Sequence, residues 1–249
     1  MLAAKDSLLC HPGAVQLADG CRHVYVDMGT NIGHQIRKLY EPALYPGNPT
    51  ESIFSKYFGE AWQRDGVCAF GFEASPVHEA SLQRLERAFH AWGRRVRVFT
   101  STAVSVAEHN VTFYTDPGAA DHHEWGASLT MTTLKDKKDL HPVTVPAIDV
   151  ACWMKMHVLS RYVPPGGQLP PAVVMKSDIE NHDMAVLSHM LTTGVLCQVS
   201  FVYGEHMTPE WLNAVKDILG RANCTTDLLY MDDESGDDNL PLPANVSGP

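Results

Sequence analysis

The sequence predicts an α/β protein whose mostly parallel central sheet is covered by helices on both faces. Strand-like and helical segments alternate along the chain, and several strands are unbroken apolar runs, as in sheets that are buried on both faces. A glycine-containing turn joins the first expected strand to the first helix, and polar residues follow the ends of later strands. With 249 residues, the chain is long enough to bury one substantial core.

The chain divides into an N-terminal extension (residues 1–22), an α/β domain (residues 23–234) and a tail (residues 235–249). The tail is acidic and rich in proline and glycine, so we expect it to be disordered. Within the domain, residues 41–65 interrupt the alternation with helix-breaking residues and one further expected helix, residues 51–63. This helical insertion is either a lid that recognises substrate or a surface excursion without a role.

The first half of the domain has clear start and stop signals. We expect strands at residues 23–28, 67–72, 96–99, 111–114 and 143–145, and a helix at residues 32–40. Another helix begins after Ser75, the expected N-cap, with Pro76 at its first position, and Gly93 ends it. The short strands at 111–114 and 143–145 flank a polar loop.

The second half continues the alternation. We expect helices at residues 150–159 and 183–193, and strands at residues 172–175, 195–203 and 228–231. Thr208 is the expected cap of a last helix, with Pro209 at its start. Parallel strands with helical crossovers therefore account for this half as well.

Composition and charge argue against two classes of function. Apolar residues make up 45% of the chain and charged residues 19%, as in ordinary globular proteins. The formal net charge is −10 and no basic stripe occurs, which argues against nucleic-acid binding. No apolar run reaches transmembrane length, and residues 1–10 do not predict a signal peptide. A soluble cytoplasmic protein is the default expectation.

The cysteines and three glycosylation triplets bear on the compartment. Cys68 and Cys197 lie in expected strands and are interpreted as small buried apolar residues, while Cys10 and Cys21 could pair in an oxidising compartment. No Cys-x-x-Cys pair occurs, which argues against a zinc ribbon. Triplets of the form Asn-x-Ser/Thr begin at Asn110, Asn223 and Asn245. They favour a secretory or Golgi location over the cytoplasm, for a chain that lacks its signal or anchor.

The segment after the first strand is the strongest local signal for a cofactor. It runs Asp27, Met28, Gly29, Thr30, Asn31, Ile32, Gly33. Gly29 allows a tight turn and the close approach of a cofactor, and Gly33 lets the next helix pack near the sheet. Asn31 stands where a dinucleotide-binding motif has its middle glycine, which argues against a pyrophosphate ligand. Asp27 is compatible with a cofactor that carries no phosphate.

Acidic residues follow two further strands. Glu73 ends the second strand, where a carboxylate can accept hydrogen bonds from both hydroxyls of a ribose, although a helix dipole also favours an acid there. Residues 176–183 follow a buried strand and contain four acidic residues or histidines. Ligands of open α/β sheets bind beyond this edge, so we expect the site there.

In combination, these segments resemble the FkbM-type family of S-adenosylmethionine-dependent methyltransferases. The match runs from about Val24 to His206 and includes residues 101–105, 126–129, 145–149 and 204–206. The resemblance implies a Rossmann-like class I methyltransferase. It also implies a binding site for S-adenosylmethionine, with Thr102 and Ala103 beside the adenine, made of Asp27, Gly29, Thr30, Asn31, Gly33, Glu73, Thr102, Ala103 and Asp178.

One segment departs from the family pattern Lys-Ile-Asp-x-Glu-Gly. The chain has Lys176, Ser177, Asp178, Ile179, Glu180 and Asn181 at these positions. Asp178 and Glu180 are retained, whereas Ser177 and Asn181 replace the isoleucine and the glycine. The chain is therefore expected to be either a divergent enzyme with a different acceptor or an impaired one.

Methyl transfer from a sulfonium cation is an in-line displacement, in which the protein aligns the acceptor and removes a proton from a hydroxyl. We expect Asp178 and Glu180 near the reacting methyl group and His206 as general base, with Glu205 and Glu124 as weaker candidates. The resemblance favours O-methylation of a hydroxyl on a sugar, a glycan or another small metabolite. The expected partners are this acceptor and the cofactor, with neither nucleic acid nor a membrane span.

Three alternatives stay open. A divalent metal held by Asp178, Glu180 and His206, with His182 as a further ligand, is not favoured, because no tight ligand spacing occurs. The chain could instead be a binding protein that kept the fold and lost turnover. A nicotinamide-dependent oxidoreductase is less favoured, because the middle glycine is missing.

Overall fold

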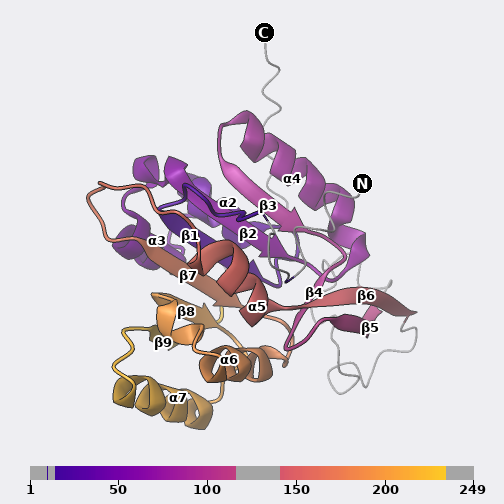
Figure 1. Cartoon of the computed structure of the whole chain (residues 1–249). Coiled ribbons are helices and arrows are strands. Elements are labelled where there is room, and N and C mark those ends of the chain that lie inside the picture. The colour runs from indigo at the N-terminus through magenta and orange to yellow at the C-terminus, as the bar shows by residue number, and fades with distance from the viewer. Residues whose placement is uncertain (1–9, 11–14, 116–140, 234–249) are drawn as a thin grey trace.

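Six parallel strands form the central sheet of the computed structural model, which describes residues 10, 15–115 and 141–233 (Figure 1). In their order across the sheet, the strands are β3 (Arg95–Phe99), β2 (Val67–Phe72), β1 (His23–Met28), β7 (Ala172–Ser177), β8 (Phe201–Gly204) and β9 (Asp227–Tyr230). The order reverses between β1 and β7, as in Rossmann-like proteins. The predicted α/β fold with a parallel sheet is confirmed.

Helices cover both faces of this sheet. One set is α2 (His34–Tyr40), α3 (Thr50–Phe58) and α4 (Glu79–Ala91); the other is α5 (Val150–Met154), α6 (Asp183–Thr192) and α7 (Pro209–Arg221). Successive side chains of β1 point to opposite faces, so Tyr25 packs with the first set and Val26 with the second. In the part of the chain that is described, no helix has the length and apolar character needed to cross a membrane.

A second, smaller sheet has the order β4-β6-β5, and Figure 1 shows it beside the central sheet. Its strands are β4 (Ala103–Ser105), β5 (His109–Thr115) and β6 (His141–Asp149). The strands expected at 111–114 and 143–145 are confirmed and longer than predicted, whereas β4 was not predicted. Three residues are too few to show a period. The loop between β5 and β6, which contains His122, His123 and Glu124, lies outside the described residues.

The expected caps are present. The Ser75 hydroxyl accepts a hydrogen bond from the amide of Val77 at 3.3 Å, at the start of a 3-10 turn, Pro76–His78, that leads into α4. The Thr208 hydroxyl accepts one from the amide of Trp211 at 3.2 Å. Both satisfy amides that have no partner within their own helix.

Three elements differ from the expectation. The helix expected at 51–63 is wrong in its second part, because α3 ends at Phe58 and a 3-10 turn, Ala61–Gly66, follows. The helix expected at 150–159 continues beyond α5 as a π-helix, Lys155–Leu159. The strand expected at 195–203 is wrong in its first part, because residues Leu196–Gln198 form a 3-10 turn and only Phe201–Gly204 form a strand. The apolar residues of this segment are buried in an irregular path, and an apolar run alone does not distinguish that path from a strand.

The insertion at residues 41–65 packs into the core through α3, with 3-10 turns at Pro42–Leu44 and Ala61–Gly66 on either side. Phe54 and Phe58 belong to the buried cluster on this face. The Arg64 guanidinium is fully buried and donates hydrogen bonds to Glu51 at 2.6 and 2.8 Å. Opening this segment as a lid would break the packing of Phe54 and Phe58 against the rest of the core.

All six cysteines form disulfides, which corrects two of the expectations. The pairs are Cys10–Cys152, Cys21–Cys68 and Cys197–Cys224. Cys68 and Cys197 are therefore not free apolar residues, and Cys10 and Cys21 pair with other partners than each other. Pairing across the fold depends on which segments meet in space, and no local pattern encodes it.

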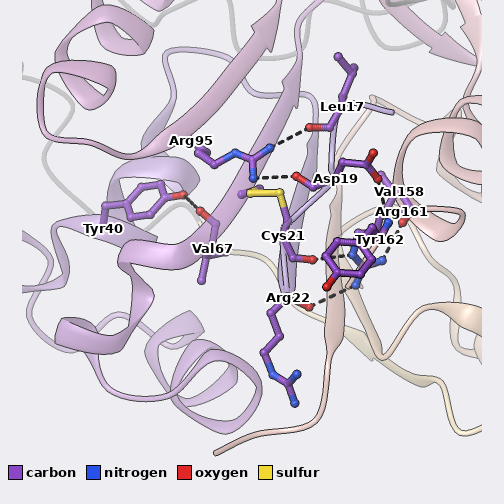
Figure 2. The surroundings of a disulfide bond; sticks show 11 residues. Leu17, Asp19, Cys21, Arg22, Tyr40, Val67, Arg95, Val158, Arg161 and Tyr162 are labelled. Carbon is purple, nitrogen blue, oxygen red and sulfur yellow. Dashed lines mark hydrogen bonds between the residues drawn. A yellow bond between two sulfur atoms is a disulfide. The ribbon is translucent and has the colours of Figure 1, made fainter. Parts of the chain in front are cut away.

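The end of the N-terminal extension is fastened to the sheet, as Figure 2 shows around the Cys21–Cys68 disulfide. The Arg95 guanidinium donates to the carbonyl of Asp19 at 2.9 Å, and that of Arg161 donates to the carbonyl of Cys21 at 2.8 Å. Ala18 and Cys21 are fully buried. Residues 15–22 are thus part of the packed structure.

Candidate active site

A cavity of about 100 Å³ lies at the carboxyl ends of β1, β7 and β8. The register pairs Asp27 with Lys176, and Ser177 with Gly204, so the polar residues that follow these strands meet at one edge. This edge is the switch point of the strand order, where ligands of such sheets bind. The lining residues are Thr30, Asn31, Ile32, His34, Gln35, Lys176, Asp178, Glu180, Tyr203, Gly204, Glu205, Met231 and Asp233.

The glycines of the turn after β1 are required by the chain itself. Gly29 has φ +80°, and a Cβ there would overlap the main-chain oxygen of Asp178. A Cβ on Gly33 would overlap the side chain of Leu85 in α4. The contacts of Gly33 agree with the helix-packing role expected for it. At Gly29, the segment that approaches the backbone closely is the loop after β7.

Glu73 clamps this turn. Its carboxylate accepts hydrogen bonds from the amides of Asn31 at 2.6 Å and Ser75 at 2.7 Å. The side chain lies at the end of β2, next to the turn that follows β1. Because a carboxylate can accept about four hydrogen bonds, these two contacts are compatible with further bonds from a ribose.

The two residues expected beside an adenine lie away from the first cavity. The Thr102 amide donates to the carbonyl of Glu73 at 2.8 Å. Thr102 lines a second hollow, of about 340 Å³, between β3 and α4. Ala103 is buried in a small cluster with residues of β6. Glu73 is therefore the link between these residues and the turn after β1.

Three carboxylates surround His206. Its Nε2 atom lies 3.7 Å from Asp178 Oδ1, 3.7 Å from Glu180 Oε2 and 4.0 Å from Glu205 Oε2. The exposed fraction of these side chains is between 20% and 27%. The structure thus brings together the three expected catalytic residues and adds Glu205, which the sequence ranked lower.

The candidate metal ligands meet only in part. Asp178, Glu205 and His206 each offer a ligand atom within 4.8 Å of the other two. His182 points elsewhere, with its Nε2 atom 3.4 Å from the Ser105 hydroxyl in β4. Glu124, a weaker candidate for the base, lies outside the described residues.

Lys176 ties the turn after β1 to the loop after β7. Its Nζ atom donates to the carbonyl of Gly29 at 2.8 Å and to Asp178 Oδ2 at 2.9 Å, and lies 3.8 Å from Asp27 Oδ1. Burial acts to lower the pKa of Lys176, but the carboxylates of Asp178 and Asp27 outweigh it and hold that pKa above its ordinary value. The sequence assigned no role to Lys176.

Asp27 is a fully buried carboxyl group under the turn. Among the described residues, neither carboxyl oxygen makes a hydrogen bond of good geometry. Burial raises its pKa to about 7, with Asp178 and Glu73 adding to the shift and Lys176 opposing it. Near neutral pH the group is therefore about half protonated, and the ammonium of Lys176, 3.8 Å away, is the main influence that favours its charged form.

The substitution Asp27→Asn is expected to stabilise the protein more at about pH 8 than at about pH 5. The pKa of Asp27 is about 7 when folded, against 3.8 ordinarily, so the folded state binds the proton more tightly. The stabilisation that this tighter proton binding provides is fully present below the ordinary pKa of 3.8. It is lost as the pH rises through the folded-state pKa of about 7. Asparagine does not titrate. Urea denaturation at both pH values checks this, and equal gains would contradict it.

The two departures from the family pattern have ordinary structural explanations. The Ser177 hydroxyl, fully buried, donates to Asp183 Oδ1 at 2.5 Å. Asn181 adopts φ +71°, a left-handed conformation that asparagine tolerates better than most residues other than glycine. The loop thus keeps a backbone suited to glycine without having one.

A buried polar network borders the cavity, and no pattern in the sequence predicts it. The hydroxyls of Tyr25 and Tyr203 lie 2.7 Å apart. Lys38 Nζ forms an ion pair with Asp233 Oδ2 at 3.0 Å, and the Gln35 amide donates to the same carboxylate at 3.2 Å. Burial lowers the pKa of Lys38. The network connects α2 to the residues that follow β9.

Comparisons with protein-family models, with curated proteins and with solved structures found no match. The fold alone does not specify a function, since Rossmann-like sheets support many reactions. Function has to be inferred from the residues at the cavity and at the turn after β1.

Proposed function

We propose that the chain is a class I methyltransferase that uses S-adenosylmethionine and methylates a hydroxyl on a sugar, a glycan or a small metabolite. The main support is the acid-rich cavity at the switch point of the sheet, lined by Asp178, Glu180, Glu205 and Asp233. Carboxylates stabilise a cationic sulfonium group in a partly buried site. The resemblance of the sequence to FkbM-type enzymes points to the same reaction.

The residues present fit this cofactor. Glu73 provides a carboxylate for the ribose at the end of β2, and the turn lacks the glycine that a pyrophosphate needs. The cavity, at about 100 Å³, is smaller than the roughly 300–1,000 Å³ of sites that enclose whole ligands. In the proposal it holds the reacting end of the cofactor and the acceptor hydroxyl, and the nucleoside extends toward Glu73.

When bound, S-adenosylmethionine supplies an electrophilic methyl group on a positively charged sulfur. His206 would accept the proton of the acceptor hydroxyl at Nε2. Asp178 and Glu180, both 3.7 Å from that nitrogen, stabilise the resulting imidazolium. Lys176 keeps Asp178 in place through its hydrogen bond at 2.9 Å.

The disulfides favour folding in an oxidising compartment over the cytoplasm. The three pairs include every cysteine of the chain. Such bonds persist in secreted proteins and in the lumen of the secretory pathway, and are rare where thiols are kept reduced. We therefore place the proposed reaction in such a lumen or outside the cell, with glycans among the acceptors.

Glu73→Gln is expected to weaken S-adenosylmethionine binding at least tenfold, on the order of 1.4 kcal/mol, because a neutral amide accepts hydrogen bonds less strongly. Calorimetric titration of the oxidised protein measures this, and Glu210→Gln, a surface change at the start of α7, is the matched control. A folded wild type that does not bind S-adenosylmethionine would overturn the proposed function.

A modified cofactor separates the ribose role of Glu73 from its role in clamping the turn. An analogue with 2′-deoxyribose should bind the wild type more weakly than S-adenosylmethionine does. If Glu73 contacts the ribose, the Glu73→Gln variant should distinguish the two ligands much less. If the missing 2′-hydroxyl lowered the affinity equally in the wild type and in the variant, Glu73 would only hold the turn and would not contact the ribose.

His206→Gln is expected to lower kcat by about 10²–10⁴-fold, with S-adenosylmethionine affinity unchanged, because it removes the general base. The assay follows transfer of the methyl group to an acceptor found by screening sugars and metabolites, with His109→Gln, at an exposed position, as control. Turnover in EDTA should equal that without it. Loss of turnover that Mg²⁺ or Mn²⁺ restores would favour the metal alternative at Asp178, Glu205 and His206.

A further inference from the structure

The turn after α7 contains one of the three glycosylation triplets, Asn223-Cys224-Thr225. Asn223 is exposed and has φ +55°, and its backbone N–H donates to the carbonyl of Gly220 at 3.1 Å. The amide of Cys224 donates to the carbonyl of Leu219 at 2.9 Å. The left-handed conformation explains an asparagine at this helix end, but it does not explain the exposed threonine two residues later.

This turn lies at the edge of the sheet opposite the cavity. Helix α7 starts after the carboxyl end of β8 and leads back to the amino end of β9, where Asp227 pairs with Phe201. The cavity lies at the other ends of these strands, beside Gly204. A large group attached to Asn223 would therefore extend into solvent and leave the cavity open.

The middle residue of the triplet reports on the compartment. Cys224 forms a disulfide with Cys197 in the 3-10 turn before β8. In eukaryotes the lumen that allows this bond is also where asparagine side chains of such triplets receive glycans. The disulfide and the triplet are separate observations that indicate the same environment.

We propose that Asn223 is an N-glycosylation site. Its side-chain amide nitrogen forms a bond to C1 of an oligosaccharide carried on a lipid pyrophosphate, the lipid pyrophosphate leaves, and the amide loses one proton. Asn110 is exposed as well, but it lies within β5 opposite Pro146, whereas Asn223 lies in a turn outside the strand pairs. The triplet at Asn245 lies outside the described residues.

The test expresses the full chain behind a cleavable secretion leader in eukaryotic cells. The substitutions Asn110→Gln and Asn245→Gln leave Asn223 as the single triplet. We expect one glycosidase-sensitive mobility shift, and enzymatic release of the glycan in ¹⁸O-water should convert Asn223 to a labelled aspartate. Thr225→Ser should keep the modification and Thr225→Ala should abolish it.

Two controls make the result decisive. The same chain without the leader, expressed in the cytosol, should carry no glycan, and peptide mapping should find the Cys197–Cys224 disulfide only in the secreted form. Glycan transfer takes place on the emerging chain, so a poorly folding variant still reports on occupancy. A secreted chain that has the Cys197–Cys224 disulfide but an unmodified Asn223 would overturn the proposal, whatever the outcome for methyl transfer.

Discussion

Replacing Lys176 by methionine is expected to lower the free energy of unfolding by about 3–5 kcal/mol, the cost of leaving a buried charge without its partner. The ammonium contacts the carbonyl of Gly29 and the carboxylate of Asp178, and it is the cation nearest to buried Asp27. Without it, Asp27 must either stay charged in an apolar setting or take up a proton. The turn after β1 also loses its link to β7.

Urea denaturation at neutral pH measures this effect. Lys56→Met is the matched control, because the ion pair of Lys56 with Asp227 is exposed by 60% and 59% and should contribute less than about 1 kcal/mol. Adding Asp27→Asn to Lys176→Met should recover part of the loss, since it removes the stranded carboxylate. A loss at Lys176 no larger than at Lys56 would contradict the structural role assigned to Lys176.

Removing the Cys21–Cys68 disulfide by Cys21→Ala and Cys68→Ala is expected to cost about 4 kcal/mol, from the entropy that the unfolded chain regains. The bond joins residues separated by 47 positions, and both cysteines are almost fully buried. The guanidinium groups of Arg95 and Arg161 donate to main-chain carbonyls of the same segment, as Figure 2 shows, and also hold it in place. The extension should then detach first on unfolding.

Two measurements check this prediction. Urea denaturation without reductant should show a lower midpoint for the double alanine variant, and limited proteolysis should cut at residues 15–22 before the sheet is lost. The single change Cys21→Ala provides a control, because it breaks the same bond and leaves one thiol. A double variant as stable as the wild type would show that hydrogen bonds and packing alone retain the extension.

Local chemistry explains what could be predicted from the sequence. Strands β1 and β2 were predicted with the bounds they have, because β2 is a nearly unbroken apolar run and β1 contains Val24 and Val26 directly before a glycine turn. The caps at Ser75 and Thr208 act within three residues of themselves. Asp178, Glu180 and His206 were expected together because neighbouring parallel strands end at one edge.

Contacts between distant segments explain what could not be predicted. Cys21 meets Cys68, and Lys176 meets Gly29 across 147 positions, only after the sheet has formed. The 3-10 turn at Leu196–Gln198 has a strand-like composition, and a disulfide joins its Cys197 to the distant Cys224. Such contacts require the register of the sheet, which single-sequence patterns do not supply.

The ion pair between Lys38 and Asp233 sets a practical limit on shortening the chain. Among the described residues the last strand, β9, ends at Tyr230, but both side chains of this pair are almost fully buried, exposed by 1% and 2%. A version trimmed at Tyr230 would keep all strands of the described residues and would still leave the Lys38 ammonium buried without its partner. The smallest stable version at this end therefore includes Asp233, and affinity tags or fusion partners should be joined beyond it.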